Sequence, residues 1–259
     1  MLFDTHAHYD DEKFIEDRFD VIEKAHSSGV SYIINASTDI KSCKESLAFA
    51  QKYEYVYAAV GIHPHELDGV DDSTLAKLLE FAKEDKVVAI GEIGLDYYYD
   101  TAPREIQQHW FSQQIDLARE LRLPIIVHDR DAHQDSVDII KAQKASEVGG
   151  VFHCYSGSVE MAKELINCNF YISVGGSLTF KNAKKLVEVV RCIPMERLLI
   201  ETDCPYLTPE PHRGKRNDSS YVRFVAEKVA EIRQMDFEEV AEATLRNAKE
   251  LFKIKAPGY

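Results

Sequence analysis

The chain lacks the features of a membrane-spanning or exported protein. No apolar run in its 259 residues approaches the length needed to cross a bilayer, although 45% of the residues are hydrophobic. The first residues, Met1 to Asp4, show no basic segment leading into a long apolar stretch, so we expect no secretory leader. The five cysteines form no CxxC pattern, and an odd number does not suit a disulfide framework. We therefore expect a cytoplasmic protein with no membrane partner.

Positive charge is also scarce. Lysine and arginine together number 31 against 44 aspartates and glutamates, which gives a formal net charge of -13. A protein that coats nucleic acid by electrostatics alone needs a surplus of basic side chains to neutralise phosphates. Any contact with nucleic acid must therefore be local or mediated by metal ions.

Short apolar runs alternate with amphipathic stretches eight times along the chain. The expected strands are Leu2 to His8, Val30 to Ser37, Val56 to His65, Val87 to Asp96, Pro124 to Arg130, Gly149 to Gly157, Phe170 to Phe180 and Leu198 to Leu207. Helical patterns between them include 14–29 and 39–53, and two more, 221–234 and 237–253, close the chain. The alternation predicts an α/β protein, a (β/α)8 TIM barrel with an extra C-terminal helix. Without a long linker, we expect one TIM-barrel domain over residues 1–259.

An open, doubly wound sheet produces a similar alternation, so periodicity alone does not separate the two folds. The positions of the polar residues do. In a barrel the carboxyl ends of the strands meet at one rim, where side chains from the first, fourth, fifth, sixth and eighth strands can converge. An open sheet would spread the same side chains over a wider front. Convergence favours the closed form.

Imidazole and carboxylate side chains stand at the ends of the apolar runs. Three pairs are spaced two residues apart, so that an extended strand would point both members to one side: His6 and His8, His63 and His65, Glu201 and Asp203. Glu92, His128 and His153 end similar runs singly. Each strand-end histidine, taken alone, also fits a hydrogen-bonded structural role. Taken as a set, these residues predict a site for divalent cations.

The number of candidates predicts two ions rather than one. One ion is expected to take His6, His8 and Asp203, the other His128 and His153, with the Glu92 carboxylate bridging both. Nitrogen and oxygen ligands admit Zn, Mg, Mn or Fe and do not select among them. Bound ions lower the pKa of water and polarise a phosphoryl or carbonyl oxygen. We expect Glu92 and Asp203 to be catalytic, with Asp203 as a proton acceptor.

Further residues have expected supporting roles. Asp4 and Glu201 each precede a ligand by two residues and are expected to orient it, although a polar role in the barrel interior is an equal alternative. A basic loop, 209–217, and the turn 175–177 follow the eighth and seventh strands, where barrels often bind phosphate; a solvated charged loop is the alternative. The aromatic run 97–99 fits either base stacking or packing on the next helix.

Several motifs together resemble the TatD family of metal-dependent deoxyribonucleases. They are Asp4-Thr5-His6-Ala7-His8, Gly61-Ile62-His63-Pro64-His65, Gly91-Glu92-Ile93-Gly94-Leu95-Asp96-Tyr97, Val127-His128-Asp129-Arg130, Phe152-His153-Cys154-Tyr155, Glu201-Thr202-Asp203-Cys204-Pro205 and Pro211-His212-Arg213-Gly214. The resemblance covers most of the chain. It implies a TIM barrel of the amidohydrolase-like superfamily that hydrolyses DNA, often as a 3'-to-5' exonuclease preferring single strands. It also implies two divalent cations on His6, His8, Glu92, His128, His153 and Asp203.

The expected substrate partner is DNA, or alternatively RNA, bound by a monomer or weak homo-oligomer. Substrate contacts are expected from His63, His65, Tyr155, Arg213 and Lys215. Related barrels hydrolyse cyclic amides, lactones or phosphotriesters, commonly with a modified lysine as the bridge, whereas here Glu92 supplies the carboxylate. A metal-dependent amidohydrolase or lactonase acting on a small molecule is therefore one alternative. A non-catalytic nucleic-acid-binding barrel is another.

Overall fold

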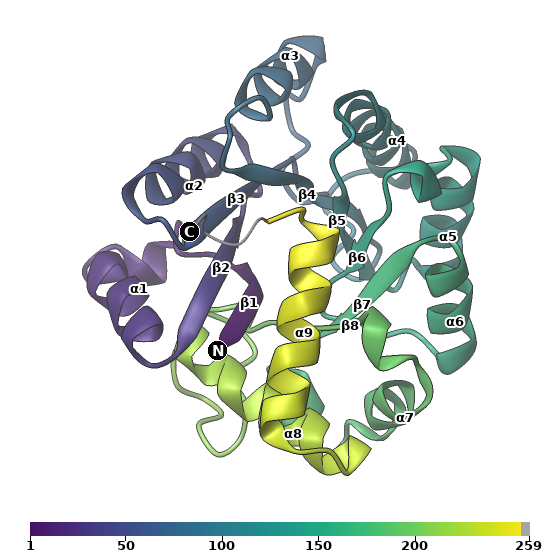
Figure 1. Ribbon diagram of the computed structural model, residues 1–259. Coiled ribbons are helices and arrows are strands. Elements are labelled where there is room, and N and C mark those ends of the chain that lie inside the picture. The colour runs from purple at the N-terminus through teal and green to yellow at the C-terminus, as the bar shows by residue number, and fades with distance from the viewer. Residues whose placement is uncertain (255–259) are drawn as a thin grey trace. The chain divides into compact units, whose positions relative to one another are not determined.

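Eight parallel strands alternate with helices in a computed structural model that describes residues 1–254 (Figure 1). The strands are β1 (Leu2–Ala7), β2 (Val30–Ala36), β3 (Val56–Val60), β4 (Val87–Asp96), β5 (Ile125–Arg130), β6 (Gly150–Phe152), β7 (Phe170–Val174) and β8 (Leu198–Ile200). The α-helices are α1 (Arg18–Ser27), α2 (Ile40–Lys52), α3 (Asp72–Phe81), α4 (Arg104–Leu121), α5 (His133–Ala142), α6 (Val159–Asn167), α7 (Lys184–Cys192), α8 (Val222–Arg233) and α9 (Phe237–Leu251). The strands follow one another in sequence order from β1 to β8. The predicted (β/α)8 barrel is confirmed, and α9 is its extra C-terminal helix.

The chain divides into two compact units. Unit 1 comprises Met1–Asn35, Cys154–Lys163 and Ile172–Tyr259, and unit 2 comprises Ala36–His153 and Glu164–Tyr171. Strands β1 and β8 belong to unit 1, whereas β3, β4, β5 and β6 belong to unit 2. The single domain expected over residues 1–259 stays a prediction, and its last five residues lie outside the described part. Among the helices of residues 1–254, none has both the length and the apolar character needed to cross a bilayer.

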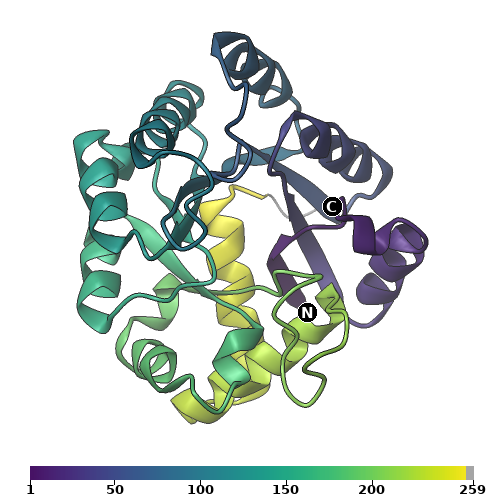
Figure 2. The ribbon, with the colours of Figure 1, turned by 180° about the vertical axis from the view of Figure 1, so that it is seen from behind.

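In unit 1, helix α9 covers the beginnings of two strands. Figures 1 and 2 show it alongside β1, and the rings of Phe3 and Phe252 lie 6.4 Å apart. The amide of Asn247 donates a hydrogen bond of 2.9 Å to the carbonyl of Leu198, the first residue of β8. Because α9 packs at the amino ends of β1 and β8, the carboxyl ends of these strands remain for polar side chains.

In unit 2, strand β4 is buried along its whole length and passes very close to β5. All ten of its residues are buried, and Gly94 pairs with His128 in the parallel register. Gly94 has a φ of +148°, and a Cβ on it would lie only 1.9 Å from the carbonyl oxygen of His128. Glycine at this position therefore permits the close approach that brings the side chains of β4 beside those of β5.

Four predicted strands are too long at their carboxyl ends. The third, sixth, seventh and eighth were expected to reach His65, Gly157, Phe180 and Leu207, but end at Val60, Phe152, Val174 and Ile200. Several residues beyond are buried without strand pairing, as Ile62 and Leu178 illustrate, so the apolar pattern continues into the loops. After β8 the backbone also turns through the left-handed region at Asp203, which no strand accommodates. The first helix likewise begins at Arg18, because residues 12–14 form a separate 3-10 turn.

Replacing Gly94 with alanine should destabilise the protein more than replacing Gly69. At residue 94 the methyl group would meet backbone, which no rotamer change can relieve. At Gly69, with φ of +69°, no described atom lies within 4 Å of the point that a Cβ would occupy, so only the left-handed backbone penalty of about 1 kcal/mol applies. We expect Gly94→Ala to lower the free energy of unfolding by about 3 kcal/mol or more, measured by urea denaturation. Equal losses in the two variants would contradict the close approach.

Candidate metal centre

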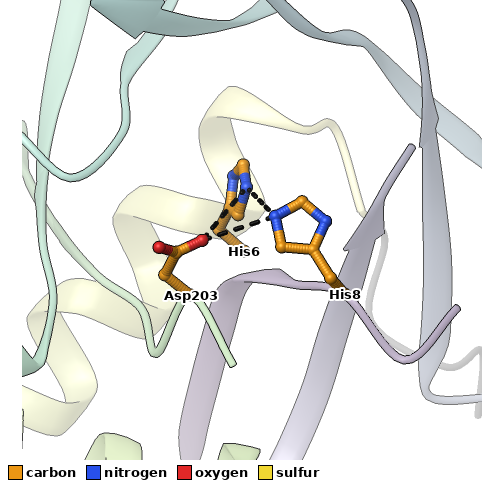
Figure 3. Close-up of side chains that lie close together, drawn as sticks. All are labelled: His6, His8 and Asp203. Atoms are coloured by element: carbon orange, nitrogen blue, oxygen red, sulfur yellow. Dashed lines mark hydrogen bonds and ion pairs between the residues drawn. The ribbon is translucent and has the colours of Figure 1, made fainter. Parts of the chain in front are cut away.

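Two histidines of the first motif and one aspartate after β8 meet in unit 1 (Figure 3). Nε2 of His6 lies 3.0 Å from Nε2 of His8, and Oδ1 of Asp203 lies 3.8 Å from the first nitrogen and 3.3 Å from the second. His6 is fully buried, and His8 is 8% exposed. Two imidazole nitrogens and one carboxylate oxygen thus converge on one point, which is the donor set that Zn, Mn or Fe accepts. We call these three residues the unit 1 group.

Backbone hydrogen bonds hold the unit 1 group in place. The N–H of Asp203 donates to the carbonyl of His6 at 2.9 Å, and the N–H of His8 donates to the carbonyl of Cys204 at 2.8 Å. Ala7 and Cys204 form a parallel bridge between these two bonds. The end of β1 is therefore joined to the segment after β8, and the three side chains are positioned by main chain rather than by one another.

Asp4 reinforces the same junction from inside the unit. Its fully buried carboxylate accepts hydrogen bonds from the backbone N–H of Thr202 at 2.8 Å and from the Thr202 hydroxyl at 2.6 Å. Burial raises the pKa of Asp4 to about 7, although the hydrogen bonds from Ser219 and Thr202 act in the opposite direction. The structure thus places Asp4 on the backbone that leads into Asp203. Its predicted role in orienting a ligand stays a prediction.

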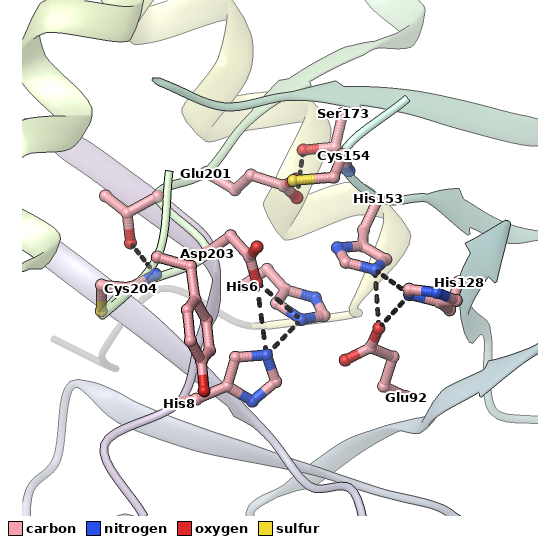
Figure 4. Close-up of polar contacts among 12 residues, drawn as sticks. His6, His8, Glu92, His128, His153, Cys154, Ser173, Glu201, Asp203 and Cys204 are labelled. Carbon is pink, nitrogen blue, oxygen red and sulfur yellow. Dashed lines mark hydrogen bonds and ion pairs between the residues drawn. The ribbon is translucent and has the colours of Figure 1, made fainter. Parts of the chain in front are cut away.

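Glu201 joins the chain after β6 to β7. Its Oε1 accepts a hydrogen bond of 2.5 Å from the backbone N–H of Cys154, and its Oε2 accepts one of 2.6 Å from the hydroxyl of Ser173 (Figure 4). The carboxylate is fully buried, and both of these bonds fix its orientation. Cys154 directly follows His153 in the sequence. Glu201 thereby fixes the backbone next to a predicted ligand, and its orienting role also stays a prediction.

In unit 2, three predicted ligands meet around one carboxylate oxygen (Figure 4). Oε1 of Glu92, on β4, lies 2.8 Å from Nδ1 of His128 and 2.7 Å from Nε2 of His153. The two imidazole nitrogens are 3.3 Å apart. Glu92 is only 3% exposed, so its charge lies where water screens it little. This arrangement also fits a divalent cation, and we call these three residues the unit 2 group.

His63 lies against the same oxygen of Glu92. Its Nε2 is 3.4 Å from Oε1, and one donor atom each of His63, Glu92 and His128 lies within 4.8 Å of the others. Burial lowers the pKa of His63 to about 4, although the Glu92 charge opposes the shift. The imidazole is therefore neutral at pH 7 and has a lone pair to donate. The sequence assigned His63 to substrate, whereas the structure gives it the setting of a ligand.

Asp96 belongs to the candidate site by its contacts, and the sequence analysis missed it. Its Oδ2 lies 3.0 Å from Nε2 of His128 and 2.9 Å from Nε2 of His65. When a cation takes Nδ1, which is directed at Glu92, the carboxylate that accepts the Nε2–H of His128 fixes the tautomer of the ring. Burial lowers the pKa of His128, but the hydrogen bonds with Asp96 and Glu92 raise it to about 9. Strand alternation could have found Asp96, because residues 92 and 96 share one face of β4.

Two predicted substrate residues stand on the loop after β8. Arg213 and Lys215 are both exposed, and the guanidinium of Arg213 lies 4.2 Å above the ring of Phe180. The neighbouring Arg216 is instead paired with Asp17 at 2.6 Å. Arg213 and Lys215 are therefore exposed on unit 1 as the sequence expects, and their contact with substrate stays a prediction.

Tyr155 and the glycine turn after β7 are engaged within the chain. The Tyr155 ring is 3% exposed, and its hydroxyl donates a hydrogen bond of 2.7 Å to the carbonyl of Ser158. A Cβ on Gly176 would lie 1.9 Å from the carbonyl oxygen of Leu207. The turn expected to approach an anion thus packs against the loop after β8. A substrate contact by Tyr155 stays a prediction, although the structure gives its hydroxyl an internal partner.

The chain is similar to known proteins over almost its whole length. Residues 3–253 match the family model described as TatD related DNase. The chain is 50% identical over 254 residues to the uncharacterized metal-dependent hydrolase YabD of Bacillus subtilis, and the match covers 98% of this chain and 100% of the relative. The name of YabD gives a metal-dependent hydrolase without a substrate, and the description of the family gives a DNase.

Solved structures give the same fold. The crystal structure of YjjV, a TatD homolog from Escherichia coli, superposes with a TM-score of 0.92 at 33% identity and covers 98% of each chain. A PTE-like lactonase variant from Deinococcus radiodurans superposes with a TM-score of 0.68 at 13% identity, covering 97% of this chain and 95% of its own. At that identity the likeness to the lactonase shows a common fold and nothing more.

Replacing Asp96 with asparagine should weaken the binding of a divalent cation to the unit 2 group about 10- to 100-fold. Asparagine keeps the size of the side chain but removes the charge that two imidazoles face. Isothermal titration with Zn²⁺ measures the affinity directly, without relying on turnover. Asp116→Asn, at an exposed carboxylate 3.3 Å from Arg119, is the matched control and should leave the affinity unchanged. A folded Asp96→Asn variant with unaltered affinity would contradict the positioning role.

Proposed function

The chain belongs to the TatD family of metal-dependent hydrolases, and we propose that it hydrolyses phosphodiester bonds of DNA as a 3'-to-5' exonuclease preferring single strands. The observation that carries the proposal is the convergence of imidazole and carboxylate donors in the unit 1 and unit 2 groups. The description of the matched family supports DNA as the substrate. Local cations at Arg213 and Lys215 support a charged phosphodiester over a neutral amide.

We propose that two divalent ions occupy the protein, drawn from Zn, Mg, Mn or Fe. One would be held by His6, His8 and Asp203, and the other by His128 and His153, with Glu92 as the predicted shared carboxylate. The donor distances within each group support this partition. His63 is added as a further candidate ligand beside Glu92. When bound, such ions polarise a phosphoryl oxygen and lower the pKa of water.

The side chains around the ions would orient substrate and move protons. Both histidines of the unit 1 group face Oδ1 of Asp203, so in this proposal the other oxygen of that carboxylate accepts the proton of the attacking water. Arg213 and Lys215 would bind the phosphates that flank the scissile bond. His65, held by Asp96, would contact substrate rather than metal. Asp4 and Glu201 would fix the backbone beside the ligands.

We further propose that the protein acts in the cytoplasm as a monomer or weak homo-oligomer. The five cysteines, all within the described residues, form no disulfide, as a reducing compartment favours. Burial raises the pKa of the Cys204 thiol well above its ordinary value, so this cysteine stays protonated and unreactive. Although it directly follows Asp203, Cys204 is in none of the donor clusters of the described residues, so we propose no ligand role for it.

A metal-dependent lactonase or amidohydrolase is the second candidate. The fold shared with a PTE-like lactonase favours it, because the same fold can position ions for attack on a carbonyl carbon. The unmodified Glu92 carboxylate and the exposed basic loop weigh towards the phosphodiester instead. A panel of single-stranded DNA, RNA, lactone and amide substrates under one metal condition distinguishes the two. Turnover of a lactone or amide without cleavage of nucleic acid would select the second candidate.

Replacing Glu92 with glutamine should lower the rate of DNA hydrolysis by at least about 100-fold, because a neutral amide cannot hold an ion as a carboxylate does. The measurement is the shortening of end-labelled single-stranded DNA with Mg²⁺, Mn²⁺ or Zn²⁺, and a chelator should abolish it. Glu147→Gln, at an exposed glutamate paired with Arg119, is the control. Wild-type protein that binds DNA without forming product at saturating metal would support a non-catalytic barrel.

Metal content should follow the proposed partition of ligands. Wild-type protein should retain about two equivalents of a tightly bound ion after dialysis, as expected of a two-ion site. His8→Ala removes a donor from the unit 1 group alone and should leave about one equivalent. Glu92→Gln should weaken both ions, since the proposal makes this carboxylate shared. Elemental analysis of the dialysed proteins measures the number of bound ions directly. A loss of one ion in each of the two variants would argue against a Glu92 carboxylate shared by both ions.

A further inference from the structure

Two neighbouring tyrosines stand exposed immediately after β4. Tyr98 and Tyr99 each have 58% of their surface accessible, and their rings meet edge to face with centroids 4.9 Å apart. The preceding Tyr97 is engaged instead, because its hydroxyl accepts a hydrogen bond of 2.8 Å from the amide of Gln108 on α4 and donates one of 2.7 Å to Asp135. Two large aromatic rings at the surface bury little area in the fold. Packing on the following helix thus accounts for Tyr97 but leaves the other two without a structural role.

A guanidinium lies over both exposed rings. The Cζ atom of Arg130, the last residue of β5, is 4.4 Å from the ring centroid of Tyr98 and 5.3 Å from that of Tyr99. The backbone carbonyl of Arg130 also accepts a hydrogen bond of 2.9 Å from the N–H of Tyr97, which ties the tyrosine turn to β5. The result is a cluster of two perpendicular rings and one cation, in a protein whose net charge is -13. We call Tyr98, Tyr99 and Arg130 the tyrosine platform.

The tyrosine platform is attached to the unit 2 group by one carboxylate. Oδ1 of Asp96 accepts hydrogen bonds from the backbone N–H groups of Tyr98 at 3.0 Å and Tyr99 at 2.9 Å. Oδ2 of the same residue faces His128 and His65. The His65 ring in turn meets the ring of Tyr99 edge to face, with centroids 5.3 Å apart. The platform is therefore continuous with the residues that surround Glu92, and its geometry is fixed by them.

We propose that the tyrosine platform stacks the bases of single-stranded DNA next to the bond that is cleaved. This inference rests on the proposed function and names the part of the protein that receives the strand. Aromatic faces bind any base, because every base has a π face, and a cation beside them binds the adjoining phosphate. Bases in a duplex are already stacked and paired on their own strand, so such a platform favours a single strand.

The test compares removal of the tyrosine rings from the protein with removal of the bases from the DNA. The Tyr98→Ala/Tyr99→Ala double variant should raise KM for a single-stranded oligonucleotide at least about fivefold, which is the lower end of what stacking of one base contributes. Its kcat should stay within about twofold of the wild-type value. The Tyr98→Phe/Tyr99→Phe variant keeps both rings and should match the wild type. For an oligonucleotide with abasic terminal residues, the KM of the wild type should rise by the same factor. The KM of the alanine variant should not rise further, since its stacking rings are already absent.

Arg130 gives an independent readout. Arg130→Gln should weaken binding of the oligonucleotide and reduce the slope of log affinity against log salt by about 0.7, the value for one phosphate contact on a single strand. Phe19→Ala, at another exposed aromatic residue on α1, is the control for the loss of a surface ring and should change neither KM nor the slope. An unchanged salt slope in Arg130→Gln would remove the phosphate contact from the proposal.

The outcomes separate the platform from the proposed function. If the wild type cleaves DNA and the alanine variant keeps its KM, the platform is wrong and the nuclease stands. If the wild type cleaves nothing, fluorescence anisotropy of a labelled oligonucleotide on the Glu92→Gln protein tests the platform alone. Base-dependent binding lost with the two rings then supports it, and equal binding overturns it. A dimer that the alanine variant converts to monomer, with DNA binding unaltered, would assign the rings to self-association instead.

Discussion

Buried carboxylates need partners, and this requirement organises the polar side chains in both units. A charged group removed from water without a partner is destabilising by several kcal/mol, so each carboxylate gathers the imidazoles that can face it. Oε1 of Glu92 has three imidazole nitrogens within 3.4 Å, and Oδ1 of Asp203 has two within 3.8 Å. The orientation of the rings therefore follows from the carboxylates. The same nitrogens that face the carboxylate oxygens point to where a cation would be coordinated.

The two groups reach this geometry by different means. In unit 1 the main chain sets the positions, since hydrogen bonds join His6 and His8 to the segment around Asp203. In unit 2 the strands β4 and β5 carry Glu92 and His128, and His153 directly follows β6. A glycine on β4 lets it approach β5 closely enough for Glu92 and His128 to meet. Both arrangements place donors on paired backbone rather than on free loops. Such support holds ligands to the small tolerances that metal coordination requires.

The sequence predicted the features that depend on the local order of residues. It did not predict the features that depend on contacts between residues far apart in the chain. Alternation of apolar runs predicted strands alternating with helices, and the expected convergence of polar residues favoured the closed barrel. Position at the end of an apolar run selected His6, His128 and Glu92 as candidates. The predicted carboxyl ends of four strands were wrong where buried residues continue into the loops. Buried loop residues and strand residues both appear as apolar runs, so the pattern does not distinguish them. The setting of His63 could not be read at all, since it depends on how close β3 and β4 bring its ring to Glu92.

Asp96 connects the unit 2 group to the tyrosine platform, because its carboxylate contacts both. One oxygen faces the imidazole of His128, and the other holds the backbone of Tyr98 and Tyr99. A displacement of the tyrosine turn must therefore also shift the hydrogen bond that sets the tautomer of His128. If a strand of DNA stacks on that turn, its binding energy acts on the same carboxylate that orients the ligand. Substrate affinity and cation affinity are then linked, and each must change the other by the same factor.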